Sequence, residues 1–190
     1  MIGLKRSEME LMKGYILGKK VYTKVFPEFY DRIAQEAETI LRPQYPLFEP
    51  AVGPRDRTRA MIKLPHLGDN VPLDWVAFGF SGLDLYDFHI GVILLMGDWP
   101  VKYHIGLHIM DPLWPSVQKE VESIDWKKGI GIDPAYAFQA PVHEHRFLDP
   151  VREINFKDLD REVRHISDRV IRFYRTSAPV AAKWASQKKG

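Results

Sequence analysis

Cysteine is absent from all 190 residues of this chain. Without a thiol the protein forms no disulfide, builds no thiolate zinc site and carries no cysteine nucleophile. The sequence also has no apolar run of about 18 residues, so we expect no membrane-spanning helix. Its first residues become acidic by Glu8 and lack the hydrophobic stretch of a secretory signal. Together these absences predict a cytoplasmic protein.

A strong excess of one charge is missing as well. The 27 Lys and Arg residues nearly balance 25 Asp and Glu residues, which leaves a net charge of +2 at pH 7. Hydrophobic residues make up 45% of the chain and charged residues 27%, which is ordinary for a globular protein. We therefore predict a single domain over residues 1–190, with its core in 24–175 and a C-terminal tail segment in 176–190.

Several common enzyme motifs are also lacking. There is no Gly-x-Ser-x-Gly sequence of a serine hydrolase and no Walker loop. Residues 129–131 read Gly-Ile-Gly, but the third glycine of a dinucleotide-binding fingerprint is absent and no clear strand precedes them. The sequence therefore indicates no particular cofactor and no reaction.

Helical periodicity is present at both ends of the chain. Apolar residues recur at helical spacing from Phe26 to Leu41, Ile40 among them, and predict a helix. Pro27 lies in its first turn, and Pro43 and Pro46 are expected to end it. A second long helix is predicted from an Asn155 cap to Pro179, which ends or kinks it. A shorter helix is expected at 7–17, with Gly18 ending it. Another is expected to begin after an Asp111 cap and to end at the glycines at 129 and 131.

The strands are expected between these helices. Strand-like segments occupy 75–80, 88–95, 103–110, 136–139 and 142–148, whereas 43–72 holds six prolines and is expected to be an irregular connection. We predict an α+β fold, a single domain with a mainly antiparallel central sheet and helices at both chain ends.

Two of these segments nearly repeat each other. Residues 88–95 read FHIGVILL and residues 103–110 read YHIGLHIM, with a turn-forming Gly-Asp-Trp-Pro between them. The short link predicts an antiparallel hairpin. If Asp98 and Trp99 form its two-residue loop, Gly91 lies opposite Gly106. His89 then lies opposite His108, and Ile93 opposite His104.

Paired glycines weaken the interior of a strand and so usually have a local reason. The preferred explanation is a helix packed closely on the sheet. The sharper one is a groove that binds a small anionic ligand or a macromolecular partner. Its candidate ligand-binding residues are His89, Gly91, His104, Gly106 and His108. On a strand His104 and His108 lie about 13 Å apart, too far for one metal ion.

A second histidine pair suggests an alternative, a metal-dependent hydrolase. His143 and His145 share one face of a strand and could supply two metal ligands. A third would come from His108 or Asp111 if their strands adjoin. Two partly exposed histidines beside Arg146 are the simpler interpretation, which we prefer.

A nucleic-acid-associated protein is the third alternative. It would use a basic segment and a row of arginines opposite the apolar face of the last helix, although charged rows more often only face water. These residues are Arg55, Arg57, Arg59 and Lys63 in the segment, and Arg161, Arg164, Arg172 and Arg175 on the helix. Nothing in the sequence indicates the oligomeric state.

The central block resembles a known family. Residues 72–79, PLDWVAFG, followed by FHIGV at 88–92, are similar to the Pro-x-x-Trp-Val-Ala-Phe stretch and Phe-x-Ile-Gly strand of the YktB-like family of uncharacterised bacterial proteins. The resemblance is loose and covers residues 24–175. It implies a compact α+β domain, and it implies no activity and no catalytic residues.

Overall fold

The computed structural model describes residues 25–45, 48–52, 61–63, 70–80, 82–84, 88–95, 101–131 and 145–187, together with isolated positions near the N-terminus. Its helices are α2 (Phe26–Leu41), α3 (Trp114–Glu122), α4 (Trp126–Ile130) and α6 (Leu159–Gln187). Its strands are β1 (Glu49–Val52), β2 (Met61–Lys63), β3 (Asn70–Gly79), β4 (Phe88–Leu95), β5 (Lys102–Ile109), β6 (His145–Leu148) and β7 (Arg152–Glu153).

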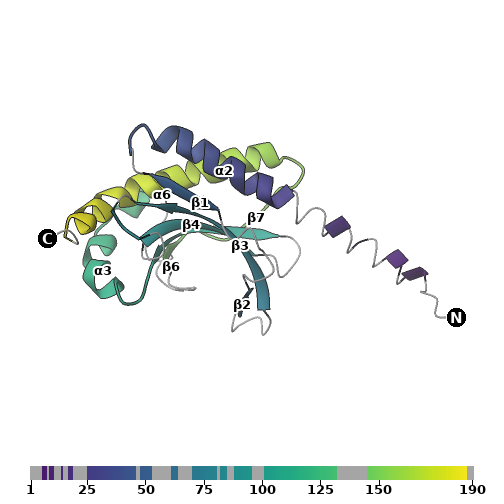
Figure 1. The fold of residues 1–190 in the computed structure, drawn as a ribbon, viewed down its shortest axis with the longest axis horizontal. Coiled ribbons are helices and arrows are strands. Elements are labelled where there is room, and N and C mark those ends of the chain that lie inside the picture. Colours follow the sequence, from purple (N-terminus) through teal and green to yellow (C-terminus); the bar gives the residue numbers. More distant parts are fainter. Residues whose placement is uncertain are drawn as a thin grey trace.

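The strands form one mainly linear antiparallel sheet. Its order is β1-β3-β4-β5-β6, with β2 beside β3 and β7 beside β5, and each of these pairs is antiparallel. Long helices lie near both ends of the chain and the sheet lies between them in sequence (Figure 1). The α+β class and the antiparallel sheet are therefore confirmed.

The hairpin has the predicted register. Gly91 pairs with Gly106, His89 with His108 and Ile93 with His104, although the connecting loop itself lies outside the described residues. The register follows from side-chain parity, because a slip of one residue would turn every core side chain to the opposite face.

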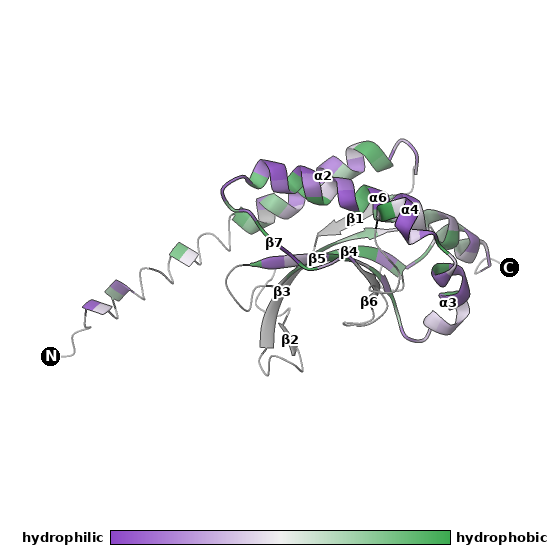
Figure 2. Cartoon of the chain, turned by 180° about the vertical axis from the view of Figure 1, so that it is seen from behind, coloured by the Kyte–Doolittle hydropathy of each residue, from purple (hydrophilic) through white to green (hydrophobic). Residues whose placement is uncertain are grey.

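Helices α2 and α6 lie side by side on one face of the sheet (Figure 1). The side chains that β4 and β5 turn toward them form the core, and the Phe88 ring lies 5.9 Å from the ring of Trp184 on α6. Hydrophobic and hydrophilic residues alternate along both helices, as expected when only one side of each is buried (Figure 2). The core residues of the hairpin are Phe88, Ile90, Val92, Leu94, Tyr103, Ile105, Leu107 and Ile109.

The last helix begins later and ends later than predicted. The Asp158 side chain, not Asn155, accepts a hydrogen bond from the Arg161 backbone N–H at 3.1 Å and caps α6. The helix then continues through Pro179 to Gln187, so residues 176–187 are not a tail. Proline leaves the Arg175 carbonyl without its helical partner, but Arg175 is exposed to water, and burial of Trp184 holds the last turns on the core.

Other local expectations need correction. The segment 43–72, expected to be irregular, contains β1, β2 and the start of β3. The backbone groups of β1 and β2 form hydrogen bonds with β3, which makes these short segments strands. Helix α3 begins after Leu113, not at an Asp111 cap, and Ile40 of α2 is 41% exposed. Near the N-terminus, Gly18 is helical, and the residues that follow it lie outside the described part of the chain. The strand predicted at 136–139 lies outside the described residues.

The two glycines at 129 and 131 belong to a separate short helix, α4, and do not break a long one. Gly131 ends α4 in the left-handed conformation, with φ of 75°. Gly129 lies against α6, where an added Cβ would come within 2.4 Å of Thr176 Oγ1. A side chain at 129 is therefore excluded by the close packing of α4 on α6. None of the helices in the described part of the chain is both long and apolar enough to cross a bilayer.

Candidate functional site

The five ligand-binding candidates lie on the face of the sheet turned away from α2 and α6. Because successive strand residues point to opposite faces, the core positions on one face place their neighbours on the other. Both long helices pack on the core face. The preferred explanation of the paired glycines, a helix packed on them, is therefore wrong for α2 and for α6. We call the opposite surface the helix-free face of the hairpin, because neither α2 nor α6 packs on it. It carries His89, Gly91 and Ile93 from β4 and Lys102, His104, Gly106 and His108 from β5.

Three small residues form a row across the middle of this face. Ala77 of β3 pairs with Gly91 of β4, which pairs with Gly106 of β5. No side chain in the row extends beyond one methyl group, and Ala77 is only 1% exposed. We call this row the small-residue floor. All three residues are buried.

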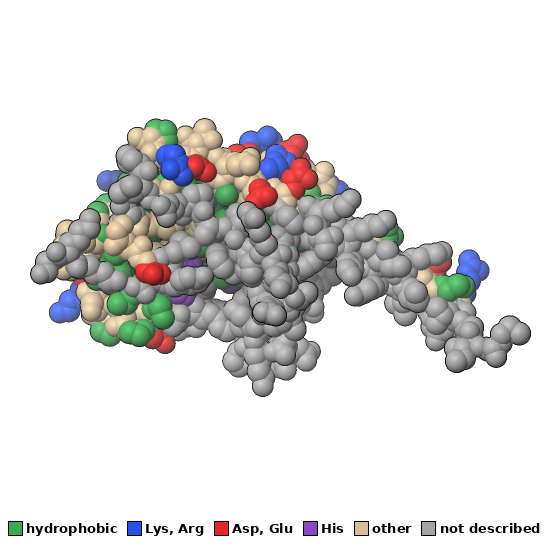
Figure 3. Space-filling model, in the orientation of Figure 1, with side chains coloured by type: hydrophobic (Ala, Val, Ile, Leu, Met, Phe, Trp, Pro, Cys, Tyr) green, Lys and Arg blue, Asp and Glu red, His purple; other side chains and the backbone are tan. Residues whose placement is uncertain are grey.

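A pair of histidines borders the floor on one side. The rings of His89 and His108 are stacked with their centroids 4.5 Å apart and their planes 19° from parallel. Both residues are half-buried. Histidine side chains reach the surface below the sheet, on the side away from the two long helices (Figure 3). Cross-strand pairing thus brings together the side chains of His89 and His108, which lie at opposite ends of the hairpin sequence.

His104 borders the floor on its other side. It is 4% exposed and lies opposite Ile93. It is four positions from His108 along β5, or about 13 Å. The structure therefore places all five candidates on one face but divides the histidines into a stacked pair and a distant third.

Strands β4 and β5 carry no carboxylate on the helix-free face, although Glu153 of β7 is the register partner of Lys102. The polar side chains of this face on β4 and β5 are three histidines and Lys102, which is half-buried at the start of β5. Each of these groups donates hydrogen bonds or accepts a proton to become cationic. The face is therefore suited to a negatively charged group.

The proposed metal-binding histidines are only partly placed. His145 is the first residue of β6, and its Cα is the register partner of His108. The register of β5 and β6 shifts between Leu107 and His108, and the two strands adjoin as this prediction requires. His143 and its surroundings lie outside the described residues. Among the residues that are described, no three His, Asp or Glu side chains converge as a metal site.

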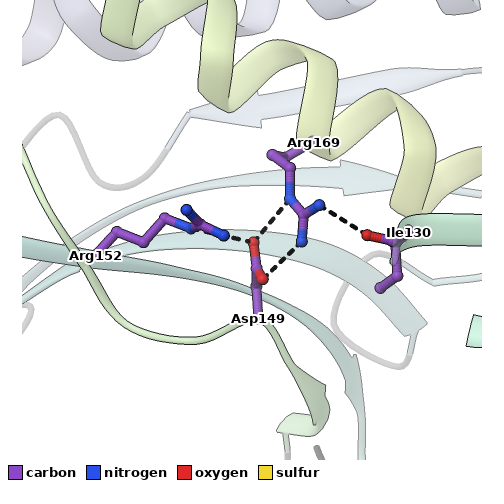
Figure 4. A network of polar contacts seen from close by, with 4 residues as sticks. All are labelled: Ile130, Asp149, Arg152 and Arg169. Atoms are coloured by element: carbon purple, nitrogen blue, oxygen red, sulfur yellow. Dashed lines mark hydrogen bonds and ion pairs between the residues drawn. The ribbon is translucent and has the colours of Figure 1, made fainter. Parts of the chain in front are cut away.

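Sequence reasoning missed a buried ion pair beside this strand. Asp149 directly follows β6 and is 1% exposed at its side chain, and Arg169 of α6 binds both of its carboxylate oxygens (Figure 4). The Arg169 guanidinium also donates to the Ile130 carbonyl at the end of α4, at 2.8 Å. The sequence held one indication of this ion pair. Arg169 lies toward the apolar side of α6, away from the row of exposed arginines, and a charge on that side requires a buried partner.

The basic residues of the nucleic-acid alternative are also only partly placed. Arg161, Arg164, Arg172 and Arg175 are all exposed on α6. Arg55, Arg57 and Arg59 lie outside the described residues, and only the backbone of Lys63 is placed, at the end of β2.

Comparisons of the chain with protein-family models, with curated proteins and with solved structures find no match. The resemblance to the YktB-like family stays a prediction.

Proposed function

We propose that this protein binds a small anionic molecule on the helix-free face of the hairpin, over the small-residue floor. The observation that carries the proposal is the row Ala77–Gly91–Gly106 beside the stacked pair His89 and His108. Glycine in the interior of a central strand is unfavourable unless something approaches the backbone closely. The two long helices lie on the other face, so neither of them is the group that approaches these glycines.

The histidine pair supports an anion in particular. A histidine ring becomes cationic when both of its nitrogens carry a proton. Two imidazolium rings with centroids 4.5 Å apart repel each other, and a bound anion offsets this repulsion. Charge-assisted hydrogen bonds from the rings would hold it. We therefore expect the protonated pair to bind an anion more tightly than the neutral pair.

Phosphate, sulfate and citrate are suitable probes. Each is titrated into the metal-free protein at pH 6.0 and 7.5 while the histidine ring resonances are followed by NMR. We expect one anion per chain, with the ring signals of His89 and His108 moving and the signal of exposed His165 unchanged. Gly106→Val fills the floor and should abolish binding.

Two further variants separate loss of the site from loss of the fold. His108→Gln keeps a polar side chain of similar size but has no titratable ring, and it should weaken binding and remove its pH dependence. Ala182→Val makes the same kind of enlargement at an exposed position of α6 and should bind like the wild type. The proposal fails if none of the three anions moves the His89 or His108 signals at millimolar concentration, or if Gly106→Val remains folded and binds normally.

A cytoplasmic location is also proposed. The absence of cysteine supports it, because the fold needs no oxidising compartment. Fractionation of cells that express a tagged full-length chain tests it, and recovery in the membrane or secreted fraction would contradict it.

A further inference from the structure

The outer surface of the two long helices separates its charges by sign. Helices α2 and α6 run in the same direction side by side, and this surface is the one turned away from the sheet (Figure 1). Acidic residues predominate along α2 and arginines along α6. We call these two sets the acidic row and the basic row. The acidic row is Glu28, Asp31 and Glu38, and the basic row is Arg161, Arg164, Arg172 and Arg175.

Most of these charges have no partner within the molecule. No ion pair joins Glu28, Asp31 or the basic row to any residue in the described part of the chain. Like charges three residues apart on one helix repel each other, as Glu28 and Asp31 do on α2 and the arginines of the basic row do in two pairs. An oppositely charged surface laid over each row would offset this repulsion.

The two rows lie at the same level along the helices. Contacts between α2 and α6 join residues 128 to 134 positions apart, from Arg32 with Asp160 to the Ile33 carbonyl with the Ser167 hydroxyl. Each residue of the acidic row has an arginine of the basic row 133 or 134 positions later in the chain. The level pairs are Glu28 with Arg161, Asp31 with Arg164 and Glu38 with Arg172.

We propose that two copies of this chain associate through this surface, with the acidic row of each copy on the basic row of the other. A two-fold axis between the helices and parallel to them turns α2 of one copy over α6 of the second copy and keeps the level of every residue. Each level pair then becomes an ion pair between the copies, and the symmetry forms every pair twice. A two-fold axis across the helices would instead place like rows together, which repulsion disfavours.

The other charges on this surface are compatible with the same arrangement. Asp168 interrupts the basic row but is level with the neutral Gln35. Arg42 is level with Arg175, and the Glu38 carboxylate, which accepts a hydrogen bond from Arg42 at 2.6 Å, offsets its charge. The helix-free face of the hairpin lies on the other side of the sheet, so this association is independent of the proposed anion binding and leaves that face uncovered.

The size of the surface predicts a weak dimer. The 16 residues of α2 extend about 24 Å, and two helices each about 10 Å wide then cover roughly 500 Å² in each copy. The total of about 1,000 Å² is close to the lower limit for a specific interface. Ion pairs at an exposed surface are screened by salt, so the association should depend strongly on ionic strength.

Analytical ultracentrifugation of the full chain at submillimolar concentration measures the association. We expect dimer at about 50 mM NaCl and monomer at about 500 mM. Glu28→Lys with Asp31→Lys makes both rows predominantly basic and should leave the chain monomeric. Arg161→Glu with Arg164→Glu makes both rows predominantly acidic and should do the same. An equimolar mixture of these two double variants should dimerise, because each row then meets a row of opposite charge.

Lys119→Glu with Lys127→Glu is the matched control. It changes the net charge as much as the arginine variant does, at exposed positions of α3 and α4, and should dimerise like the wild type. If a variant fails to fold, dilution of the wild type followed by NMR provides the test, since backbone amide signals should move along the outer sides of α2 and α6.

The inference is overturned if the wild type stays monomeric at low salt, if either double variant dimerises like the wild type, or if their mixture stays monomeric. It is also overturned if dilution moves amide signals of the sheet and not of the two helices. A monomeric wild type that heparin retains, when Arg161→Glu with Arg164→Glu is not retained, would show that the basic row binds a polyanion instead of a second copy.

Discussion

The Arg169 guanidinium binds both oxygens of the Asp149 carboxylate, and the two side chains are only 13% and 1% exposed. A charge buried this far is stable only while its partner is present. The Nε of Arg152 is 3.9 Å from the same carboxylate and half in solvent, so it cannot take over the bidentate contact.

Arg169→Met should therefore lower the free energy of unfolding by about 3–5 kcal/mol, because it leaves the buried Asp149 carboxylate without its main partner. Urea denaturation measures the change. Arg172→Met is the matched control on the exposed side of the same helix and should change the free energy by less than about 0.5 kcal/mol. Equal effects of the two substitutions would show that the ion pair contributes nothing specific.

Tyr103 should make the protein sensitive to alkali. Burial of its phenol, with a smaller contribution from Glu162, raises the pKa of Tyr103 to about 12. An unfolded tyrosine has a pKa near 10, so the folded state is favoured in full below about pH 10 and loses this advantage as the pH rises to about 12. Tyr103→Phe should have a shallower loss of stability over that range than the wild type. Urea denaturation at pH 8 and pH 11 provides the comparison, and parallel losses would refute the assignment.

Gly129→Ala should destabilise the contact between α4 and α6. The new methyl carbon would lie 2.4 Å from Thr176 Oγ1 and 2.7 Å from its Cγ2, and overpacking of this kind costs about 1–3 kcal/mol. Thr176→Ala removes both of these atoms, so the double variant should recover most of the loss. A double-mutant cycle in thermal unfolding measures the coupling, and purely additive effects would contradict the packing explanation.

Trp184→Ala distinguishes a packed helix from a tail. Trp184 is 7% exposed and belongs to the core, so its truncation should cost about 3–5 kcal/mol. A residue in a solvated tail would show almost no effect. Lys183→Ala, the neighbouring exposed position, should change stability little even though its ammonium contacts Glu120 at 2.8 Å.

The sequence by itself determined the elements that depend on local pattern. The period of apolar residues, with Pro43 and Pro46 as the expected end, predicts a helix that covers the observed α2 from Phe26 to Leu41. The parity of two similar strands predicts the pairing of Gly91 with Gly106, because any odd shift would move core side chains into the wrong layer.

Only the tertiary structure decided which segments distant in sequence meet. Local pattern does not show that β6 lies beside β5, and therefore could not place His145 opposite His108. Nor could it show that Arg169 reaches Asp149, or that burial of Trp184 carries α6 past Pro179. Each of these outcomes depends on packing and pairing energies between segments, which exceed the local preferences of the residues involved.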